Sequence, residues 1–148
     1  MDLKSKIILI SGPTASGKSK AALKIAKKLN GEIINADSMQ VYKELKILTA
    51  RPSKTDLNKI DHHLYGFRSV KKEFSSGEWL KLAKKNIKKI RDKNKIPVLV
   101  GGTGLYFKAL TDGLVKIPKI PISVRDKIRR MQNKLGQKKF YLKLLNND

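Results

Sequence analysis

The segment Gly12-Pro-Thr-Ala-Ser-Gly-Lys-Ser19 decides the fold, because it has the G-x-x-x-x-G-K-S spacing of a Walker A phosphate-binding loop. The apolar run Lys6-Ile-Ile-Leu-Ile10 precedes it and predicts a buried parallel strand. From Lys18 onward, apolar residues recur every three or four positions, which predicts a helix that ends at Asn30-Gly31. The predicted order is strand, glycine loop and helix, which is the arrangement found where such a loop binds phosphate.

Two further strands extend this start into an open sheet. Glu32-Ile-Ile-Asn-Ala36 predicts a second strand and places Asp37 at its carboxyl end, while residues 39–74 predict mostly loop with short elements. Ile96-Pro-Val-Leu-Val100 predicts a third buried strand, which runs into Gly101-Gly-Thr-Gly104. The expected fold class is α/β, with a parallel sheet of the P-loop NTPase kind flanked by helices.

The remaining helices are predicted from caps and apolar stripes. Ser75 and Glu78 have the spacing of a capping box, and an apolar stripe continues through Trp79 to Ile90. The Trp79 side chain is expected in the core rather than as a platform for base stacking. A short apolar helix is expected from Leu105 to about Leu110.

The C-terminal part is expected to be separate from a core domain at residues 1–115. Two prolines in Lys116–Pro121 predict a linker, because proline resists both helix and strand. Past the linker, a helix is expected from Val124 to Leu135, a break at Gly136 and a second helix from Phe140 to Leu145.

Length and composition exclude several classes of protein. The chain has 148 residues, of which 40% are hydrophobic, so it is long enough to bury a core. No apolar run reaches the 18 or more residues of a membrane span, and the start lacks a signal-peptide pattern. There is no cysteine, which excludes disulfides and thiolate metal sites. We expect a cytoplasmic protein that is not bound to a membrane, and a monomer.

The charge is strongly positive. The chain has 34 Lys and Arg against 12 Asp and Glu, a net charge of +22, and residues 116–148 alone carry +8. Such a field attracts a polyanion and favours contacts with an RNA phosphate backbone. The excess consists mainly of lysine, however, so codon bias explains it equally well. The basic composition therefore permits an RNA partner without proving one.

The Walker A loop predicts a diphosphate site. Its glycines let backbone amides turn toward phosphate oxygens, and the start of the helix adds its positive end. Lys18 supplies a mobile cation, and the Ser19 hydroxyl is placed to bind Mg²⁺. The residues expected to hold the phosphates are Gly12, Pro13, Thr14, Ala15, Ser16, Gly17, Lys18 and Ser19.

Asp37 is the candidate catalytic carboxylate. The carboxyl ends of parallel strands meet at one edge of a sheet, so Asp37 is expected beside the phosphate loop. There it could take a proton from a nucleophile, although a turn or helix-cap aspartate would have the same spacing. His62 and His63 are adjacent and would point to opposite faces of a strand, so a histidine metal site is not expected.

Five motifs together resemble the tRNA dimethylallyltransferase family, also called the tRNA isopentenyl transferases. They occur in the family's order: Gly12–Ser19, Asp37-Ser-Met-Gln-Val-Tyr42, Thr49-Ala-Arg-Pro52, His62-His-Leu64 and Leu99-Val-Gly-Gly-Thr-Gly-Leu-Tyr-Phe107. The resemblance as a whole runs from about Ile7 to the end of the chain. An ordinary P-loop kinase would share only the first motif.

The resemblance implies transfer of a dimethylallyl group from its diphosphate to N6 of the adenosine 3′ of the tRNA anticodon. It implies that Lys18 stabilises the leaving diphosphate, with Mg²⁺ on Ser19, and that Asp37 is the general base. Thr103 matches a residue at the flipped-out adenosine. The implied tRNA contacts are Asp37, Ser38, Met39, Gln40, Thr103 and, in a Val-Arg match past the linker, Arg125. Residues 116–148 would begin the family's helical tRNA-binding insertion.

Other functions remain open at this point. A small P-loop nucleotide or nucleoside kinase would also explain the Walker A loop, and with it ATP binding. A fragment that binds RNA or diphosphate without turnover is a third, non-catalytic alternative.

Overall fold

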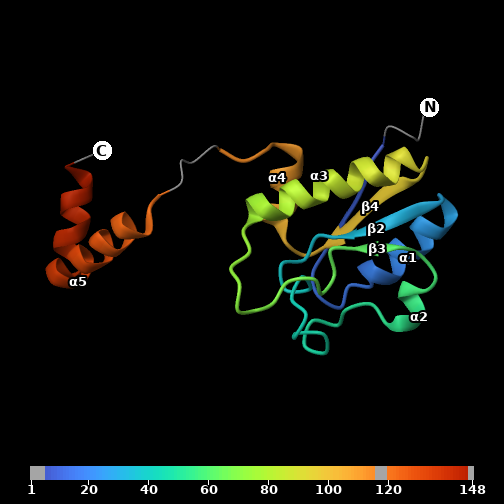
Figure 1. Cartoon of the computed structure of the whole chain (residues 1–148), viewed down its shortest axis with the longest axis horizontal. Helices are drawn as coiled ribbons and strands as arrows, with labels where there is room; N and C mark the ends of the chain where they lie inside the picture. Colours follow the sequence, from blue (N-terminus) through green and yellow to red (C-terminus); the bar gives the residue numbers. More distant parts are fainter. Residues whose placement is uncertain (1–5, 116–119, 147–148) are drawn as a thin grey trace. The chain divides into compact units, whose positions relative to one another are not determined.

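The computed structural model of the chain describes residues 6–115 and 120–146, in two compact units, Met1–Leu114 and Val115–Asp148 (Figure 1). In the first unit strands and helices alternate. The described elements are β1 (Ile8–Ser11), α1 (Lys18–Lys28), β2 (Gly31–Asn35), α2 (Lys54–Leu57), β3 (His62–His63), α3 (Ser76–Asp92), β4 (Ile96–Gly101) and α4 (Gly104–Thr111).

The four strands form one parallel sheet in the order β1-β4-β2-β3. β4 lies in the middle, where Val98 pairs with Ile8 of β1 on one side and with Ile33 of β2 on the other. All strands therefore end at the same edge of the sheet, and the loops that follow them meet there. The predicted α/β class with a parallel sheet is confirmed.

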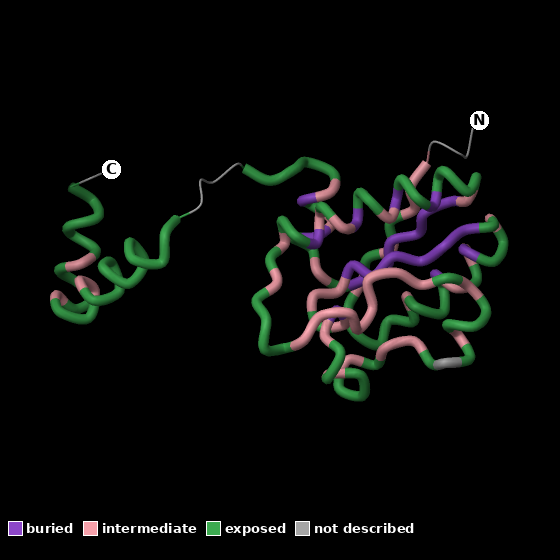
Figure 2. Tube along the Cα trace, viewed as in Figure 1, coloured by how far each residue is buried: buried purple, intermediate pink, exposed green. Residues whose placement is uncertain are grey.

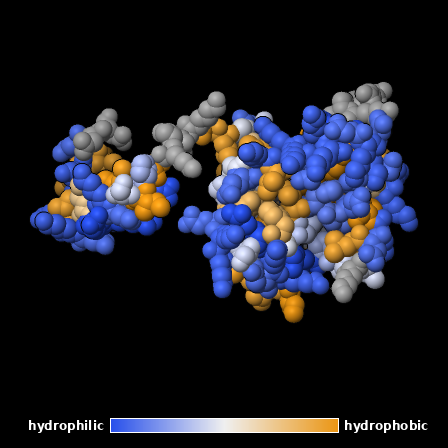
Figure 3. Space-filling model, in the orientation of Figure 1, coloured by the Kyte–Doolittle hydropathy of each residue, from blue (hydrophilic) through white to orange (hydrophobic). Residues whose placement is uncertain are grey.

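Two apolar layers cover the sheet, because side chains alternate between its faces. Ile33 and Val98 pack with α1, whereas Ile34 and Leu99 pack with α3 and α4. β2 and β4 are buried along their whole length and form the centre of the unit (Figure 2). The lysines of α3 lie on its outer side, and hydrophilic residues cover most of this face of the first unit (Figure 3).

The predicted elements of the first unit are present, with ends that differ by one or two residues. The helix expected from Ser75 is α3, and its capping box is formed: Ser75 Oγ accepts from the Glu78 amide at 3.2 Å, and Glu78 Oε2 accepts from the Ser75 amide at 3.0 Å. The segment 39–74 is mostly loop, as expected. The short α2 and β3 within it were not located by the sequence.

The second unit contains α5 (Ile122–Leu145), which includes the predicted break. Gly136 has φ 73° and ψ 164°, so two helices meet at a kink there. None of the described α5 residues is buried. The predicted linker Lys116–Pro121 falls largely outside the described residues. Within residues 6–115 and 120–146, no helix has both the length and the hydrophobicity needed to cross a bilayer.

Candidate functional site

The phosphate loop connects β1 to α1 at the carboxyl edge of the sheet. Ala15 and Gly17 have positive φ angles of 63° and 81°, which turn the backbone around the loop. No other atom would crowd a Cβ at Gly17, so its backbone conformation, not space, favours glycine there. The amides at the start of α1 have no side-chain cap and no acidic neighbour in the first turn. This helix start can therefore bind an anion.

Lys18 is held inside the loop. Its Nζ donates a hydrogen bond to the Pro13 carbonyl at 2.8 Å. The ammonium group thus stays over the loop rather than extending into solvent. An incoming diphosphate could replace the carbonyl as its acceptor, with a gain in strength because the new acceptor is charged.

A pocket of about 610 Å³ joins the phosphate loop to the end of β2. Ser19 and Lys18 line one side, and Asp37 lines another. The predicted site residues that share this pocket are Thr14, Ala15, Gly17, Lys18, Ser19, Asp37, Met39 and Gln40. The phosphate loop and the Asp37 carboxylate thus line one cavity, and their roles in binding and catalysis stay predictions.

Other predicted residues do not line the pocket. Gly12, Pro13 and Ser16 belong to the loop but do not line the cavity, and neither do Ser38 and Thr103, which are hydrogen-bonded to each other. Arg125 is exposed on α5 in the second unit. Its role in the site stays a prediction.

Thr103 holds the segment that follows Asp37. Its Oγ1 accepts from the Ser38 amide at 2.9 Å and donates to Ser38 Oγ at 3.2 Å. Its own amide donates to the Ala36 carbonyl at 3.2 Å. Thr103 therefore supports the strand end that carries Asp37.

The Asp37 carboxylate has one oxygen engaged. Its Oδ1 accepts from the Met39 amide at 2.9 Å, which closes a tight turn. Within the described residues, no hydrogen bond reaches Oδ2. One carboxylate oxygen is therefore available as a proton acceptor in a pocket that also holds the phosphate loop.

The glycines after β4 permit close approach of the two strand ends. A Cβ on Gly101 would lie 2.1 Å from the Ala36 carbonyl, so only glycine fits. A Cβ on Gly102 would lie 3.5 Å from the Gly12 carbonyl and 3.8 Å from Asp37 Oδ2. Gly102 thus lies between the phosphate loop and the carboxylate, a role that the motif Gly101–Gly104 did not reveal.

The phenols of Tyr106, which is buried, and Tyr65, which is half-buried, stay neutral near Asp37. Burial, followed by the nearby Tyr42 and the charge of Asp37, raises the pKa of Tyr106 to about 12. Burial and then the Asp37 charge also raise the pKa of Tyr65 above its usual value. Neither phenol is therefore a competing base at neutral pH.

The apolar wall of the pocket was not predicted. Leu45 and Leu48 also line the cavity, within the segment expected to be loop, and Leu48 is 85% exposed. Gln40 fixes this wall, because its Nε2 donates to the Thr49 carbonyl at 2.8 Å. The Gln40 side chain is thus committed to a neighbouring loop, whereas Met39 is 52% exposed at the pocket. The sequence pattern of residues 39–74 has no periodicity from which this wall could be read.

Trp79 is a core residue, as expected. Its side chain is fully buried and stacks on Tyr106, with ring centroids 4.2 Å apart and planes 9° apart. Its Nε1 donates to the Asn35 carbonyl at 2.9 Å. The indole therefore stabilises β2 from within the core, and it does not line the pocket.

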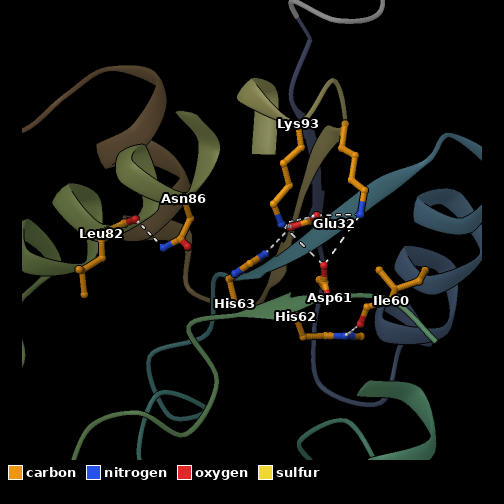
Figure 4. Close-up of polar contacts among 9 residues, drawn as sticks. Glu32, Ile60, Asp61, His62, His63, Leu82, Asn86 and Lys93 are labelled. Atoms are coloured by element: carbon orange, nitrogen blue, oxygen red, sulfur yellow. Dashed lines mark hydrogen bonds and ion pairs between the residues drawn. The ribbon is translucent and has the colours of Figure 1, made fainter. Parts of the chain in front are cut away.

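A second polar cluster lies near the opposite ends of the same strands (Figure 4). The Glu32 side chain is fully buried and accepts from Lys93 Nζ and Lys95 Nζ, each at 2.9 Å. His63 Nε2 lies 2.7 Å from Glu32 Oε2, whereas His62 Nδ1 lies 2.7 Å from the Ile60 carbonyl. The two histidines thus have separate partners, and burial lowers the pKa of His62.

Comparison with known proteins identifies the family. The family model described as IPP transferase matches residues 40–148. The chain belongs to the IPP transferase family. A tRNA dimethylallyltransferase of Pelagibacter ubique is 66% identical over 100% of this chain and 47% of its own length.

Solved structures of the family share the fold. A tRNA isopentenylpyrophosphate transferase from Bacillus halodurans is 35% identical and has a TM-score of 0.73. The match covers 97% of this chain and 48% of that protein. A eukaryotic dimethylallyltransferase acting on tRNA is 32% identical, with a TM-score of 0.75, over 87% of this chain and 34% of its own. The chain spans about half the length of the curated relatives it matches, 47% for the Pelagibacter ubique protein.

Proposed function

We propose that the chain forms the prenyl-diphosphate pocket and the acceptor-facing base of a tRNA dimethylallyltransferase. The reaction would move a dimethylallyl group from its diphosphate to N6 of the adenosine 3′ of the anticodon. The observation that carries the proposal is that the phosphate loop and Asp37 share one pocket in a member of the IPP transferase family.

The phosphate loop is the donor side of this mechanism. The diphosphate would bind at the amides that begin α1, and Lys18 would exchange the Pro13 carbonyl for a phosphate oxygen. When the allylic C1–O bond breaks, its electron pair leaves with the diphosphate. Fixed amides and Lys18 then stabilise the charge that develops there.

Asp37 is the acceptor side. The N6 lone pair of adenine forms the new bond to the allylic C1, and a proton on N6 passes to Asp37. Its Oδ2 is the oxygen proposed to take that proton, because Oδ1 already accepts from the Met39 amide. The apolar side chains of Leu45 and Leu48 would contact the dimethylallyl tail.

Mg²⁺ is the proposed metal ion. Ser19 lies on the same pocket as Lys18, and Mg²⁺ commonly takes one or two protein oxygens, phosphate oxygens and water. Ser19 Oγ would hold the ion together with the diphosphate. Bound there, Mg²⁺ would neutralise charge on the leaving group.

The tRNA would approach the exposed side of Asp37. Met39 is the exposed member of the segment Asp37–Gln40 and is proposed to contact the anticodon loop. Ser38 and Thr103 would shape that surface through their shared hydrogen bonds. Arg125 is proposed as a phosphate contact on α5. We also propose that the protein acts in the cytoplasm, where tRNA would be its substrate, and that it acts as a monomer.

The test is transfer of labelled dimethylallyl to tRNA under single-turnover conditions. It uses the chain as given and an extended chain, in which the remaining C-terminal residues of the Pelagibacter ubique relative follow residue 148. Label in tRNA from wild type, slowed about 10²–10⁴-fold by Asp37→Asn, is the expected result. Phosphate transfer from ATP to a nucleoside, without labelled tRNA, would support a kinase instead. Binding without transfer in both chains would support a non-catalytic role.

A further inference from the structure

We infer that Asn35 is a positioning residue that holds Asp37 in the orientation needed for proton transfer. The inference rests on the proposed function of Asp37. Asn35 is the last residue of β2, and its side chain is fully buried. It comes two residues before the carboxylate and does not itself line the pocket.

The Asn35 amide group binds the Asp37 backbone on both sides. Its Oδ1 accepts from the Asp37 amide at 2.9 Å, and its Nδ2 donates to the Asp37 carbonyl at 2.9 Å. Both backbone groups of one residue are thus held by one side chain. Because Oδ1 of Asp37 is in turn held by the Met39 amide, little freedom remains for the carboxylate.

The same side chain ties this corner to the segment after β3. Asn35 Nδ2 also donates to the Leu64 carbonyl at 3.0 Å, and Leu64 has a φ of 63°. That angle is uncommon for a non-glycine residue and needs support from its surroundings. Asn35 therefore fixes Asp37 against a second loop as well as against its own strand.

Only an amide meets these requirements at this position. One oxygen must accept from an N–H, and one nitrogen must donate to two carbonyls. An aspartate of the same shape would place an oxygen against both carbonyls, and a serine is too short and has one donor. Each replacement leaves buried polar groups unpaired and frees the Asp37 backbone.

Asn35→Asp and Asn35→Ser test the inference in the extended chain. Each is expected to slow single-turnover transfer by about 10- to 100-fold, because small misplacements of a reacting group have effects of that size. The dissociation constant for dimethylallyl diphosphate is expected to change less than twofold, since the phosphate loop does not contact Asn35. Such a split between rate and binding would not arise from general loss of stability.

Trp79→Phe is the matched control. It removes the hydrogen bond to the Asn35 carbonyl but leaves the Asn35 side chain on Asp37. We expect it to lower the unfolding temperature with less than a twofold change in the transfer rate, measured well below that temperature. A folded Asn35 variant that transfers at the rate of Trp79→Phe would overturn the inference. Failure of both Asn35 variants to fold would overturn it too, in favour of a purely structural residue.

Amide hydrogen exchange separates this inference from the proposed function. In the chain as given, Asn35→Ser should speed exchange at the amides of Asp37 and Met39 at least tenfold, relative to Trp79→Phe. Absence of transfer by wild type would refute the proposed function, whatever the exchange data. Unchanged exchange at both amides would refute the positioning role, even where wild type transfers label.

Discussion

The buried Glu32 gives a stability prediction that does not depend on activity. Burial alone would raise its pKa, but hydrogen bonds from Lys95, Lys93 and His63 outweigh burial and lower the pKa from 4.5 to about 2. This stabilisation is fully present above pH 4.5, the pKa of Glu32 in the unfolded chain, and it is lost as the pH falls toward 2. One pKa unit corresponds to about 1.4 kcal/mol, so Glu32 contributes about 3 kcal/mol at pH 7.

Glu32→Gln removes the charge and keeps the size of the side chain. We expect the free energy of unfolding to fall by about 3 kcal/mol at pH 7 and by only about 1 kcal/mol at pH 3, because part of the stabilisation by the wild-type Glu32 charge is already lost at pH 3. Asp61, which faces Lys93 at 3.8 Å and Lys95 at 3.9 Å, is largely exposed and cannot replace the buried carboxylate.

Urea denaturation followed by tryptophan fluorescence measures this effect. Trp79 is the one tryptophan of the chain and is buried in the first unit, so its emission reports on the sheet that contains Glu32. Glu73→Gln makes the same change of charge at an exposed site and should alter stability by less than about 0.5 kcal/mol. The reasoning is refuted by a loss at pH 7 no larger than that of Glu73→Gln, or by a loss that is equal at pH 7 and pH 3.

Three further predictions concern the site. Lys18→Ala should weaken dimethylallyl diphosphate binding by about 1.5–3 kcal/mol, and equal affinity in calorimetry would contradict its assignment. Gly101→Ala should destabilise the fold by on the order of 3 kcal/mol, because its Cβ would clash with the Ala36 backbone, whereas Gly102→Ala makes only ordinary contacts and should fold normally. Thermal unfolding compares the two variants, and equal unfolding temperatures would contradict this reasoning. Arg125→Ala should reduce the slope of log affinity for tRNA against log salt by about 0.9, and an unchanged slope in filter binding would remove α5 from the RNA site.

Local patterns predicted much of the fold. The phosphate loop, the helix after it and the strands before Asp37 and Gly101 each depend on residues that are close in sequence. The capping box of Ser75 and the break at Gly136 are local in the same sense. These features can be predicted without knowing which strands pair with each other.

The order of the strands could not be read in this way. β4 lies between β1 and β2, although it comes last in the chain, and its pairing brings Gly101 against Ala36. The Glu32 cluster has the same origin, because Lys93 and Lys95 follow α3 and reach the start of β2 only through that pairing. In the sequence, Glu32 is simply a charged residue at the start of an apolar run.

The two sides of the candidate site therefore differ in how well sequence describes them. The proposed donor side is one loop, whose own backbone and Lys18 would supply the contacts to phosphate. The proposed acceptor side is built around Asp37 by Asn35 at the end of β2, Leu64 after β3 and Thr103 after β4. In the sequence, Asn35 is recognisable only as a polar residue at the end of a buried strand. Many residues of that kind have no positioning role. The distinction follows from the chemistry: a mobile diphosphate needs donors that a single turn can supply, whereas a base must be held by surroundings that only the complete sheet brings together.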